Sequence, residues 1–420
     1  MRTLHEAALG VLRRPGGHGR EPSRAGPAVT AGPRASGAAR AGRAETVRFA
    51  AARALPLLGR GFAGPRPVFS PDTLRSLRAR HGGAPVLVRG LTGNVLVLLD
   101  PQELRQFYAE PAGAGAGPVP PVCPTLQAVL VEEARRLSVD AVLDLGRVRE
   151  AVARTARRIA LGDRAGAAEE PVARPGPLRR RDRARAALAD VHDLPARAAR
   201  RLAAPGAAGA VGPAAARVGP SPAGTAGAGA AVADAAGRCW VRAMDAIPAT
   251  LLRTLLLLGS HPAEQDAAAA EAAAGGAPGE LPRLRACVQE TLRLYPAVPD
   301  LIRVTRTETE WRGVRHPAGT AVLLPAHFHQ RDPAHVPAAH VFVPGRWKSP
   351  DADQDLRMSP FGHGPGRCPG DRLGLLVTTA LCAEILRRTR IRAVRPVLDP
   401  PGPLPTALDP RGIRLALSRR

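Results

Sequence analysis

Three long helical patterns in the C-terminal half limit the fold more than any other feature of this chain. They span Ala243–Leu258, which is almost wholly apolar, Leu281–Leu294, which is amphipathic, and residues 370–388. The second pattern stops at Tyr295-Pro296, because the residue before a proline is driven out of the helical conformation. Segments of this kind predict that helices supply most of the core.

Strand patterns are shorter and fewer. Pro85–Arg89 and Asn94–Leu99 are β-branched runs on either side of a glycine-bounded turn, and they predict a hairpin. Short extended runs lie within residues 301–325, and Ile413–Leu417 predicts a terminal strand. Further helices are expected after the caps Ser70 and Asp100 and over residues 126–145 and 148–161.

Two segments have no such pattern. Residues 1–45 are rich in Gly, Pro, Ala and Arg and predict a disordered basic tail, with a targeting peptide as the alternative. Residues 163–236 have a similar composition and include Ala204–Gly229, where disorder is expected. For the remaining chain, residues 46–420, length alone would suggest two or three domains, and a single large fold is the alternative.

The composition argues against a specific nucleic-acid binder, a disulfide-linked protein and a membrane-spanning protein. The net charge is +24, and Lys348 is the single lysine, so arginine carries nearly all of the positive charge. No basic run is interleaved with aromatic residues and no zinc spacing occurs, which argues against a specific nucleic-acid function. The 5 cysteines form no Cys-x-x-Cys, as expected in a reducing cytoplasm. No apolar stretch reaches the ~18 residues that would suggest a membrane span.

A glycine- and proline-rich loop holds one cysteine immediately before the last helical pattern. The loop runs from Phe361 to Gly370 and contains Cys368. Its glycines permit backbone conformations that a Cβ would forbid. A helix that begins near the sulfur directs N–H groups and its positive dipole end at a thiolate. The pattern predicts a thiolate ligand of a metal, as in a haem with an axial cysteine. A buried, unreactive thiol is the alternative.

Two further motifs precede this loop. Glu290 and Arg293 lie on one face of a predicted helix, and Arg346 follows within Phe342-Val-Pro-Gly-Arg-Trp347. With the cysteine loop, they resemble the signatures of the cytochrome P450 family, of its soluble bacterial type. The resemblance extends over residues 46–420. It implies the cytochrome P450 fold, mainly α with a small β region, and a buried structural triad of Glu290, Arg293 and Arg346.

The same resemblance implies haem b, an iron protoporphyrin IX, as the cofactor. Cys368 is then the expected ligand of the iron. Phe361, Gly364 and Gly370 match the family spacing around it. Gly366 stands where the family has an arginine that binds a haem propionate, and Arg367 follows one residue later.

The other expected contacts to the haem propionates are arginines. Arg303 occupies the place of a propionate-binding arginine on a strand, and a solvated strand arginine is the alternative. The Trp-x-x-x-Arg motif of the family is absent, which leaves Arg136, or else Arg135, for that contact. Together with Arg367, Arg303 and Arg136 are the candidate cofactor-binding arginines.

The segment Arg242–Pro248 resembles the family's distal helix, in which an acid and a threonine deliver protons to dioxygen. Asp245 holds the acid position, and Ala246 replaces the threonine. Asp245 and Ala246 are therefore the candidate catalytic positions. A hydroxylase could deliver protons through Asp245, water or a substrate hydroxyl. Alternatively, the enzyme resembles haem-thiolate isomerases and dehydratases, and Asp245 can also be a surface acid.

The expected function is that of a cytoplasmic, monomeric monooxygenase that acts on a small apolar molecule. Its electrons would come from a separate ferredoxin or flavodoxin, since no flavin or iron–sulfur domain is evident. Four arginines, Arg367, Arg372, Arg387 and Arg388, are expected to cluster and to steer this acidic partner. A degenerate, non-catalytic haem protein and an arginine-rich nucleic-acid binder are the alternatives from other classes.

Overall fold

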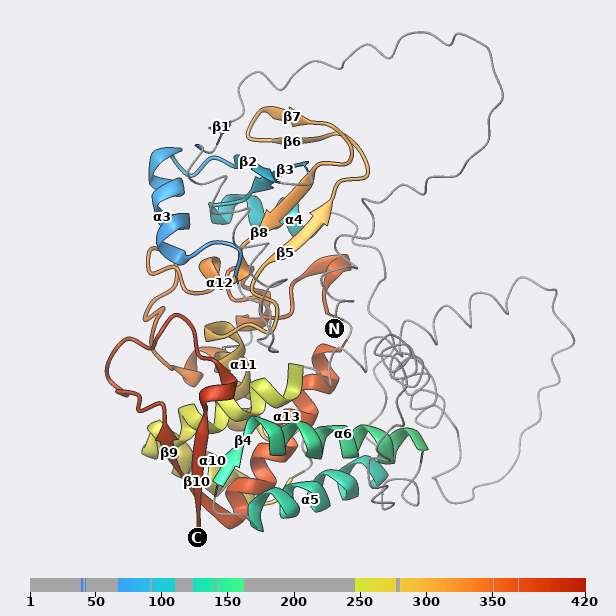
Figure 1. Cartoon of the computed structure of the whole chain (residues 1–420), viewed down its shortest axis with the longest axis vertical. Helices are drawn as coiled ribbons and strands as arrows, with labels where there is room; N and C mark the ends of the chain where they lie inside the picture. Colours follow the sequence, from blue (N-terminus) through green and yellow to red (C-terminus); the bar gives the residue numbers. More distant parts are fainter. Residues whose placement is uncertain are drawn as a thin grey trace, which may run out of the picture. The chain divides into compact units, whose positions relative to one another are not determined.

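The computed structural model describes two compact units, each built from two separate stretches of the chain. The described residues are 39–40, 42, 67–90, 93–109, 124–139, 142–161, 246–276, 280–349, 351–368 and 370–420. The first unit, here called the sheet unit, lies within Met1–Phe107 and Val298–His329. The second, here called the helical unit, lies within Tyr108–Ala297 and Gln330–Arg420. Figure 1 draws the described elements in colour along the sequence.

The sheet unit is organised around a mixed sheet with the strand order β1-β2-β3-β8-β5. Strands β2 and β3 form the predicted antiparallel hairpin, β3 runs parallel to β8, and β8 pairs antiparallel with β5. Its elements are β1 (Ala39–Arg40), α3 (Pro71–Arg80), β2 (Val86–Gly90), β3 (Gly93–Val97), η2 (Pro101–Glu103), the start of α4 (Leu104–Ala109), β5 (Leu301–Val304), β6 (Thr309–Trp311), β7 (Val314–His316), β8 (Ala321–Leu324) and α12 (Ala326–His329).

Helix α3 shows how the sequence specifies this unit. The Ser70 hydroxyl oxygen accepts a hydrogen bond from the Thr73 N–H at 3.2 Å, which satisfies a free donor of the first turn. Leu74 and Leu77 are fully buried in the same apolar cluster as the sheet residue Val86. The predicted capped helix is confirmed.

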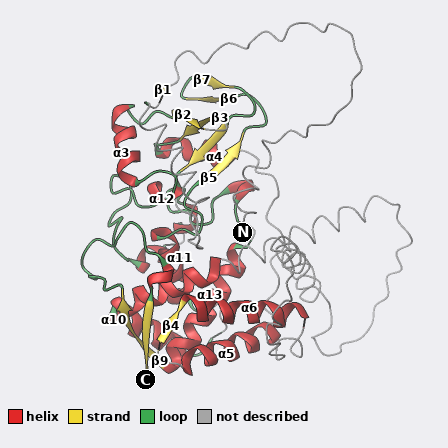
Figure 2. Ribbon diagram, viewed as in Figure 1, coloured by secondary structure: helices red, strands yellow, loops and turns green. Residues whose placement is uncertain are grey.

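Helices supply the core of the helical unit, and three strands form its small sheet, ordered β4-β10-β9. In Figure 2 this unit is mostly red, with those strands in yellow. Residues 246–260 are helical. The other elements are α5 (Pro124–Val139), β4 (Val142–Asp144), α6 (Leu145–Leu161), α10 (Pro262–Ala273), α11 (Pro282–Leu294), η4 (Pro344–Lys348), η5 (Ala352–Gln354), η6 (Gly364–Gly366), α13 (Asp371–Arg388), β9 (Thr389–Arg395), η7 (Pro410–Gly412) and β10 (Arg414–Arg419).

Helix α13 lies at the centre of the helical unit and packs against α5, α10 and α11. Its residues Val377, Leu381 and Ile385 are completely buried, at the four-residue spacing of one helix face. The neighbouring Cys382 is also buried, so α13 contacts apolar neighbours around most of its circumference. This explains the nearly continuous apolar sequence of the last helical pattern.

One expected helix is shorter than its pattern suggests. The prediction over residues 126–145 is wrong beyond Val139, where α5 ends. Val142–Asp144 instead forms β4, which pairs antiparallel with β10. Leu143 is opposite Leu415, and both side chains are fully buried. Because strand pairing with a segment far away in the sequence stabilises Leu143, local helical periodicity does not decide its conformation.

The predicted tail is described only in small part. Ala39 and Arg40 pair in parallel with Val86 and Leu87, so these two residues are held in the sheet. Apart from Gly42, the rest of the predicted tail and the whole of residues 163–236 lie outside the described residues. No helix in the described part of the chain is long and apolar enough to cross a membrane.

Candidate functional site

Cys368 lies in a closed turn at the N-terminal end of α13. Its backbone N–H donates to the Phe361 carbonyl oxygen at 2.8 Å, and its own carbonyl oxygen accepts from the Asp371 N–H at 3.3 Å. The first bond closes the loop, and the second links the cysteine to the first helical residue. The Cys368 side chain is exposed. A thiol in this position is accessible to a ligand and lies near the positive end of a helix of 18 residues.

Gly364 gives the loop its shape through a close approach to Tyr108. Gly364 has φ +60°, and a Cβ at this position would overlap the Tyr108 carbonyl oxygen. The Tyr108 ring also packs edge-on against His363, with 5.4 Å between the ring centroids. Burial, with a smaller contribution from the charge of Arg367, holds the pKa of His363 below its usual value. Sequence reasoning missed Tyr108, since no local motif marks it.

Substituting Gly364 tests whether this close approach holds the cysteine loop in place. Gly364→Ala is expected to destabilise the fold by about 2–4 kcal/mol, because it adds a left-handed backbone cost to a steric overlap. Urea unfolding of the variant measures the change. The matched control is Gly374→Ala within α13, where a Cβ meets nothing within 4 Å. Equal stability of the two variants would contradict the packing of Tyr108 on this loop.

Arg367, a candidate cofactor-binding residue, is oriented by an acid one helical turn later. Its Nε donates to Asp371 Oδ2 at 2.7 Å. The other Asp371 oxygen accepts from the Arg372 backbone N–H at 2.6 Å. The side chain of Arg367 is 34% exposed, so its remaining donors are accessible.

The expected cluster of four arginines does not form. Arg367 and Arg372 lie at the start of α13, whereas Arg387 and Arg388 are its last residues. At ~1.5 Å per residue, the two pairs are separated by roughly 22 Å along the helix axis. Arg387 also bonds to Glu384 and to the Ala272 carbonyl oxygen in its own surroundings. The prediction failed because it grouped residues without counting the length of the helix between them.

Glu290, Arg293 and Arg346 lie together in a single cluster. Arg293 Nε and Nη2 donate to the two oxygens of Glu290 at 2.9 and 2.8 Å, and both side chains are completely buried. Arg346 Nε donates to Glu290 Oε1 at 3.1 Å. Arg293 Nη1 additionally donates to the carbonyl oxygens of Gln330 and Ala339 at 2.7 and 2.9 Å. These hydrogen bonds hold helix α11 against the irregular segment that begins at residue 330.

Two more donors complete the surroundings of Glu290. The Trp347 indole N–H donates to Glu290 Oε2 at 2.9 Å, and the Val343 N–H donates to Oε1 at 3.0 Å. Burial raises the pKa of Glu290, but the hydrogen bonds and charges of Arg293 and Arg346 outweigh burial and hold it below its usual value. Sequence analysis did not assign Trp347 to this group. Its position directly after Arg346 was the available signal.

Arg303 belongs to the sheet unit, where it lies on the edge strand β5. Its guanidinium is 4.5 Å above the ring centre of Phe107, and its Nη1 donates to the Phe107 carbonyl oxygen. The side chain is therefore held against Phe107 of α4 by cation–π and hydrogen-bond contacts. Its contact with a propionate stays a prediction.

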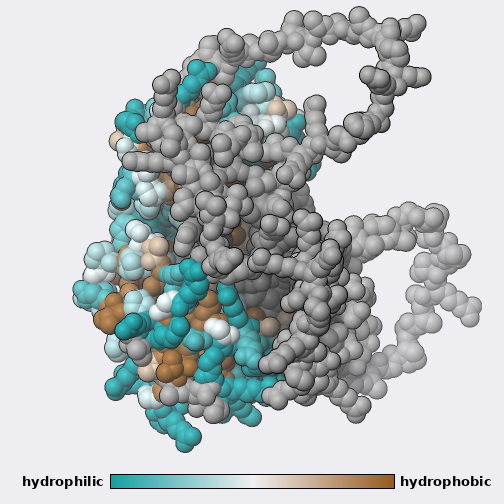
Figure 3. All heavy atoms as spheres, in the orientation of Figure 1, coloured by the Kyte–Doolittle hydropathy of each residue, from teal (hydrophilic) through white to brown (hydrophobic). Residues whose placement is uncertain are grey.

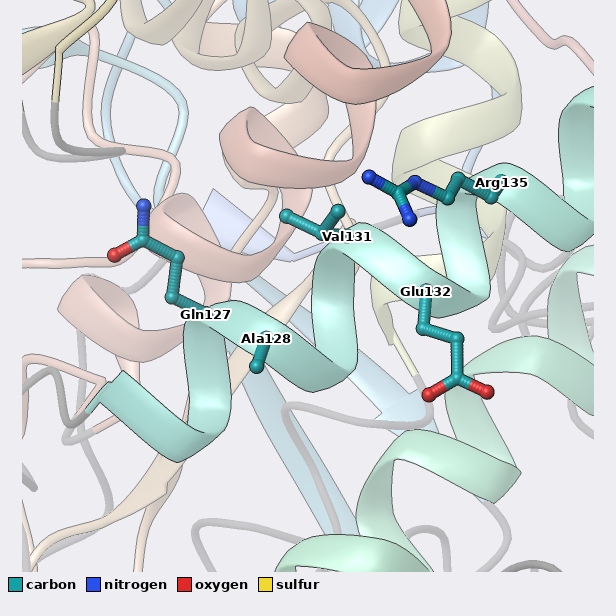
Figure 4. Close-up of a pocket in the computed structure, with 5 residues that line it drawn as sticks. All are labelled: Gln127, Ala128, Val131, Glu132 and Arg135. Atoms are coloured by element: carbon teal, nitrogen blue, oxygen red, sulfur yellow. The ribbon is translucent and has the colours of Figure 1, made fainter.

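Arg136 and Arg135 lie on α5 in different surroundings. Arg136 donates to Glu132 and Glu133 at 2.6 and 3.2 Å, and its side chain is 47% exposed. Arg135 lines an open hollow of about 590 Å³ on α5, with Gln127, Ala128, Val131 and Glu132 (Figure 4). A propionate contact from Arg136 stays a prediction, and it would compete with these carboxylates.

The distal positions are only partly described. Asp245 lies outside the described residues. Ala246 begins the described part of the helix, and its carbonyl oxygen accepts a hydrogen bond from the Thr250 hydroxyl at 3.0 Å. Pro248 is buried within the same helix, and the helical conformation continues through it to residue 260.

Part of the chain is similar to a known protein family. The family model described as Cytochrome P450 matches residues 242–411, which include the helix at Ala246, the Glu290 cluster and the Cys368 loop. Over these residues the chain is similar to the cytochrome P450 family. Members of this family bind haem b.

Two curated P450 relatives show how far the similarity extends. Cyclooctat-9-en-7-ol 5-monooxygenase of Streptomyces melanosporofaciens is 34% identical over 189 residues, 41% of this chain and 41% of that protein. The mitochondrial 25-hydroxyvitamin D-1 alpha hydroxylase of Homo sapiens is 33% identical over 161 residues, 36% of this chain and 32% of that protein. The chain therefore matches less than half of the length of these relatives.

A solved structure, a zebra fish cytochrome P450 with abiraterone, is similar to this chain with a TM-score of 0.59. The match covers 83% of this chain and 98% of that one, at 17% identity. This P450 likeness confirms the predicted fold, mainly α with a small β region.

The cysteine loop of this chain fits a haem with an axial thiolate. A haem needs a single protein ligand below the iron, and Cys368 supplies an exposed sulfur in a turn that two backbone hydrogen bonds define. Gly362, with φ +71°, and Gly364 keep side chains out of the loop before the sulfur. Cys287 and Cys382 are unsuitable, because burial raises the pKa of both thiols far above the usual range.

Proposed function

We propose that this protein is a haem-thiolate monooxygenase that inserts one oxygen atom from dioxygen into a small apolar molecule. Cys368, exposed in its closed turn at the start of α13, is the observation that carries the proposal. When bound, the haem would supply the redox chemistry, and its thiolate ligand favours cleavage of the O–O bond. The relatives named monooxygenase and hydroxylase support this reaction class.

The residues of this chain would have separate tasks. Cys368 would hold the iron, within a loop shaped by Phe361, Gly364 and Gly370. Arg303, Arg136 and Arg367 are proposed donors to the propionates, since each has a guanidinium suited to a carboxylate. The Glu290 cluster would keep the segment after residue 330 in place and would touch neither haem nor substrate.

An apolar substrate agrees with side chains in the sheet unit. Val298, Ile302 and Val304 are 48%, 42% and 36% exposed, although each is a large apolar residue. Ile302 and Val304 alternate with Arg303 along β5 and so lie on the opposite face of the strand. An apolar ligand that covered these side chains would be stabilised by their burial.

Electrons would come from a separate acidic ferredoxin or flavodoxin. Arg367 and Arg372, at the start of α13, are the basic residues beside the cysteine loop that could attract it. We further propose that the protein acts in the cytoplasm as a monomer of one haem domain over residues 46–420.

A second function is a haem-thiolate isomerase or dehydratase. Ala246 favours it, because this residue has no hydroxyl with which to pass a proton. In the monooxygenase, Asp245, water or a substrate hydroxyl would replace the missing threonine as the route of proton delivery.

Placing a hydroxyl at residue 246 separates the two functions. In a monooxygenase limited by proton delivery, Ala246→Thr is expected to raise the yield of hydroxylated product per electron about tenfold or more. Ala246→Val has the same shape without a hydroxyl and is expected to give no gain. The measurement is product formed per donor oxidised, together with oxygen uptake. Absence of oxygen uptake in all three proteins would favour the isomerase.

A further inference from the structure

Four arginines line one face of the small sheet in the helical unit. Arg392 is opposite Ala416, Arg390 is opposite Ser418, and Arg395 is opposite Arg414. Residues opposite each other share a face. Arg390, Arg392, Arg395 and Arg414 are all exposed, and they are called the arginine face below. The other face is apolar, since Ile391 and Leu415 are buried in the core. Figure 1 shows β9 and β10 side by side near the C-terminus.

Acidic side chains neutralise this face only in part. Asp266 accepts from Arg390 at 3.3 Å, and Asp144 lies 3.9 Å from Arg414. No ion pair joins Arg392 or Arg395 to an acidic side chain in the described part of the chain. The face therefore has an excess of positive charge.

Large apolar side chains are exposed at both margins of the arginine face. Val397 follows β9 by two residues and is 87% exposed, the largest value among the exposed large apolar residues described. Val142, on the opposite edge strand β4, is 44% exposed. Figure 3 shows hydrophobic and hydrophilic residues side by side on the described surface at this end. A partner that covered the arginine face could also bury these two side chains, and their burial would stabilise its binding.

We propose that the arginine face binds an anionic phospholipid surface, with Val397 entering the interface. Arginines near an anionic leaflet are attracted to its phosphates, and exposed apolar side chains at the same level gain from burial among the acyl chains. A nucleic acid would use the arginines but not the valines. Strands β4, β9 and β10 also contain no aromatic residue that could stack on bases. This surface association is independent of the proposed reaction.

The test is co-sedimentation of the full chain with phosphatidylcholine vesicles, with and without about 30% phosphatidylserine. Binding is expected only to the vesicles that contain phosphatidylserine, and it should weaken at high salt. Arg392→Glu/Arg395→Glu is expected to lower partitioning at least about tenfold, because each arginine contributes roughly fivefold. Val397→Asp should lower partitioning onto the vesicles at low and at high salt, because the contribution of Val397 to binding is apolar.

The control variant carries the same change of charge on a different surface, in the sheet unit. Arg306→Glu/Arg315→Glu alters exposed arginines of the sheet unit and should retain vesicle binding. Thermal midpoints establish that each variant is folded. Equal loss in both double variants would overturn the proposal, because net charge alone would then explain binding. Loss of duplex DNA or polyglutamate binding in Arg392→Glu/Arg395→Glu, with vesicle binding unchanged, would overturn it in favour of a nucleic acid or an acidic protein.

Discussion

Replacing Cys368 with serine is expected to abolish the thiolate-type Soret band that the reduced protein gives with carbon monoxide. The band requires a sulfur anion on the iron, and Cys368 is exposed in a turn that directs it away from the core. Serine preserves the size of the side chain and the backbone hydrogen bonds. The expected result is therefore loss of the band, together with loss of all monooxygenase activity, in a folded protein.

The control for this experiment is Cys382→Ala. Cys382 is fully buried in α13, so this variant should lose some stability but keep the thiolate band. Difference spectra and thermal midpoints of both variants are the measurements. A thiolate band that persists in Cys368→Ser would assign the iron to another cysteine and overturn the proposed site.

Glu290→Gln is expected to destabilise the protein by about 3–5 kcal/mol. The change removes the buried negative charge and leaves the buried Arg293 and the nearly buried Arg346 without compensation. The matched control is Glu264→Gln, which breaks an ion pair with Arg283 whose side chains are 33% and 32% exposed, and it should cost about 0–1 kcal/mol. Urea unfolding measures both values. A similar small cost for both variants would show that the Glu290 cluster is not a structural support.

The same carboxylate predicts the direction of pH dependence. The pKa of Glu290 in the folded protein lies below its ordinary value of 4.5, so ionised Glu290 favours the folded state. This stabilisation is complete above that value and is lost as the pH falls through the lower pKa of the folded state. Wild type should therefore lose its stability advantage over Glu290→Gln in acid. An advantage that grows as the pH falls would contradict the assignment.

Much of the fold and part of the site could be predicted from sequence because the signals are local. The cap at Ser70, the stop at Tyr295-Pro296 and the apolar character of α13 each act within a few residues, and each gave the expected element. The family signatures are also short, so Cys368 and the Glu290 motif could be found without any knowledge of packing.

Errors and omissions arose where distant segments meet. Leu143 is a strand residue because Leu415 lies opposite it, although the local pattern is helical. Tyr108 shapes the cysteine loop through its carbonyl oxygen, which no side-chain pattern reveals. The four arginines expected around the cysteine separate into two pairs, because a helix of 18 residues lies between them.

The sequence by itself indicated the resemblance to the cytochrome P450 family, the candidate thiolate Cys368 and the Glu290, Arg293 and Arg346 motif. Only the tertiary structure decided which groups meet these residues. It brought Trp347 and the Val343 N–H to Glu290, joined Arg367 to Asp371 and placed four arginines on one face of a sheet. The physical reason is that short motifs specify chemical groups, whereas burial and charge compensation depend on chain segments brought together by folding.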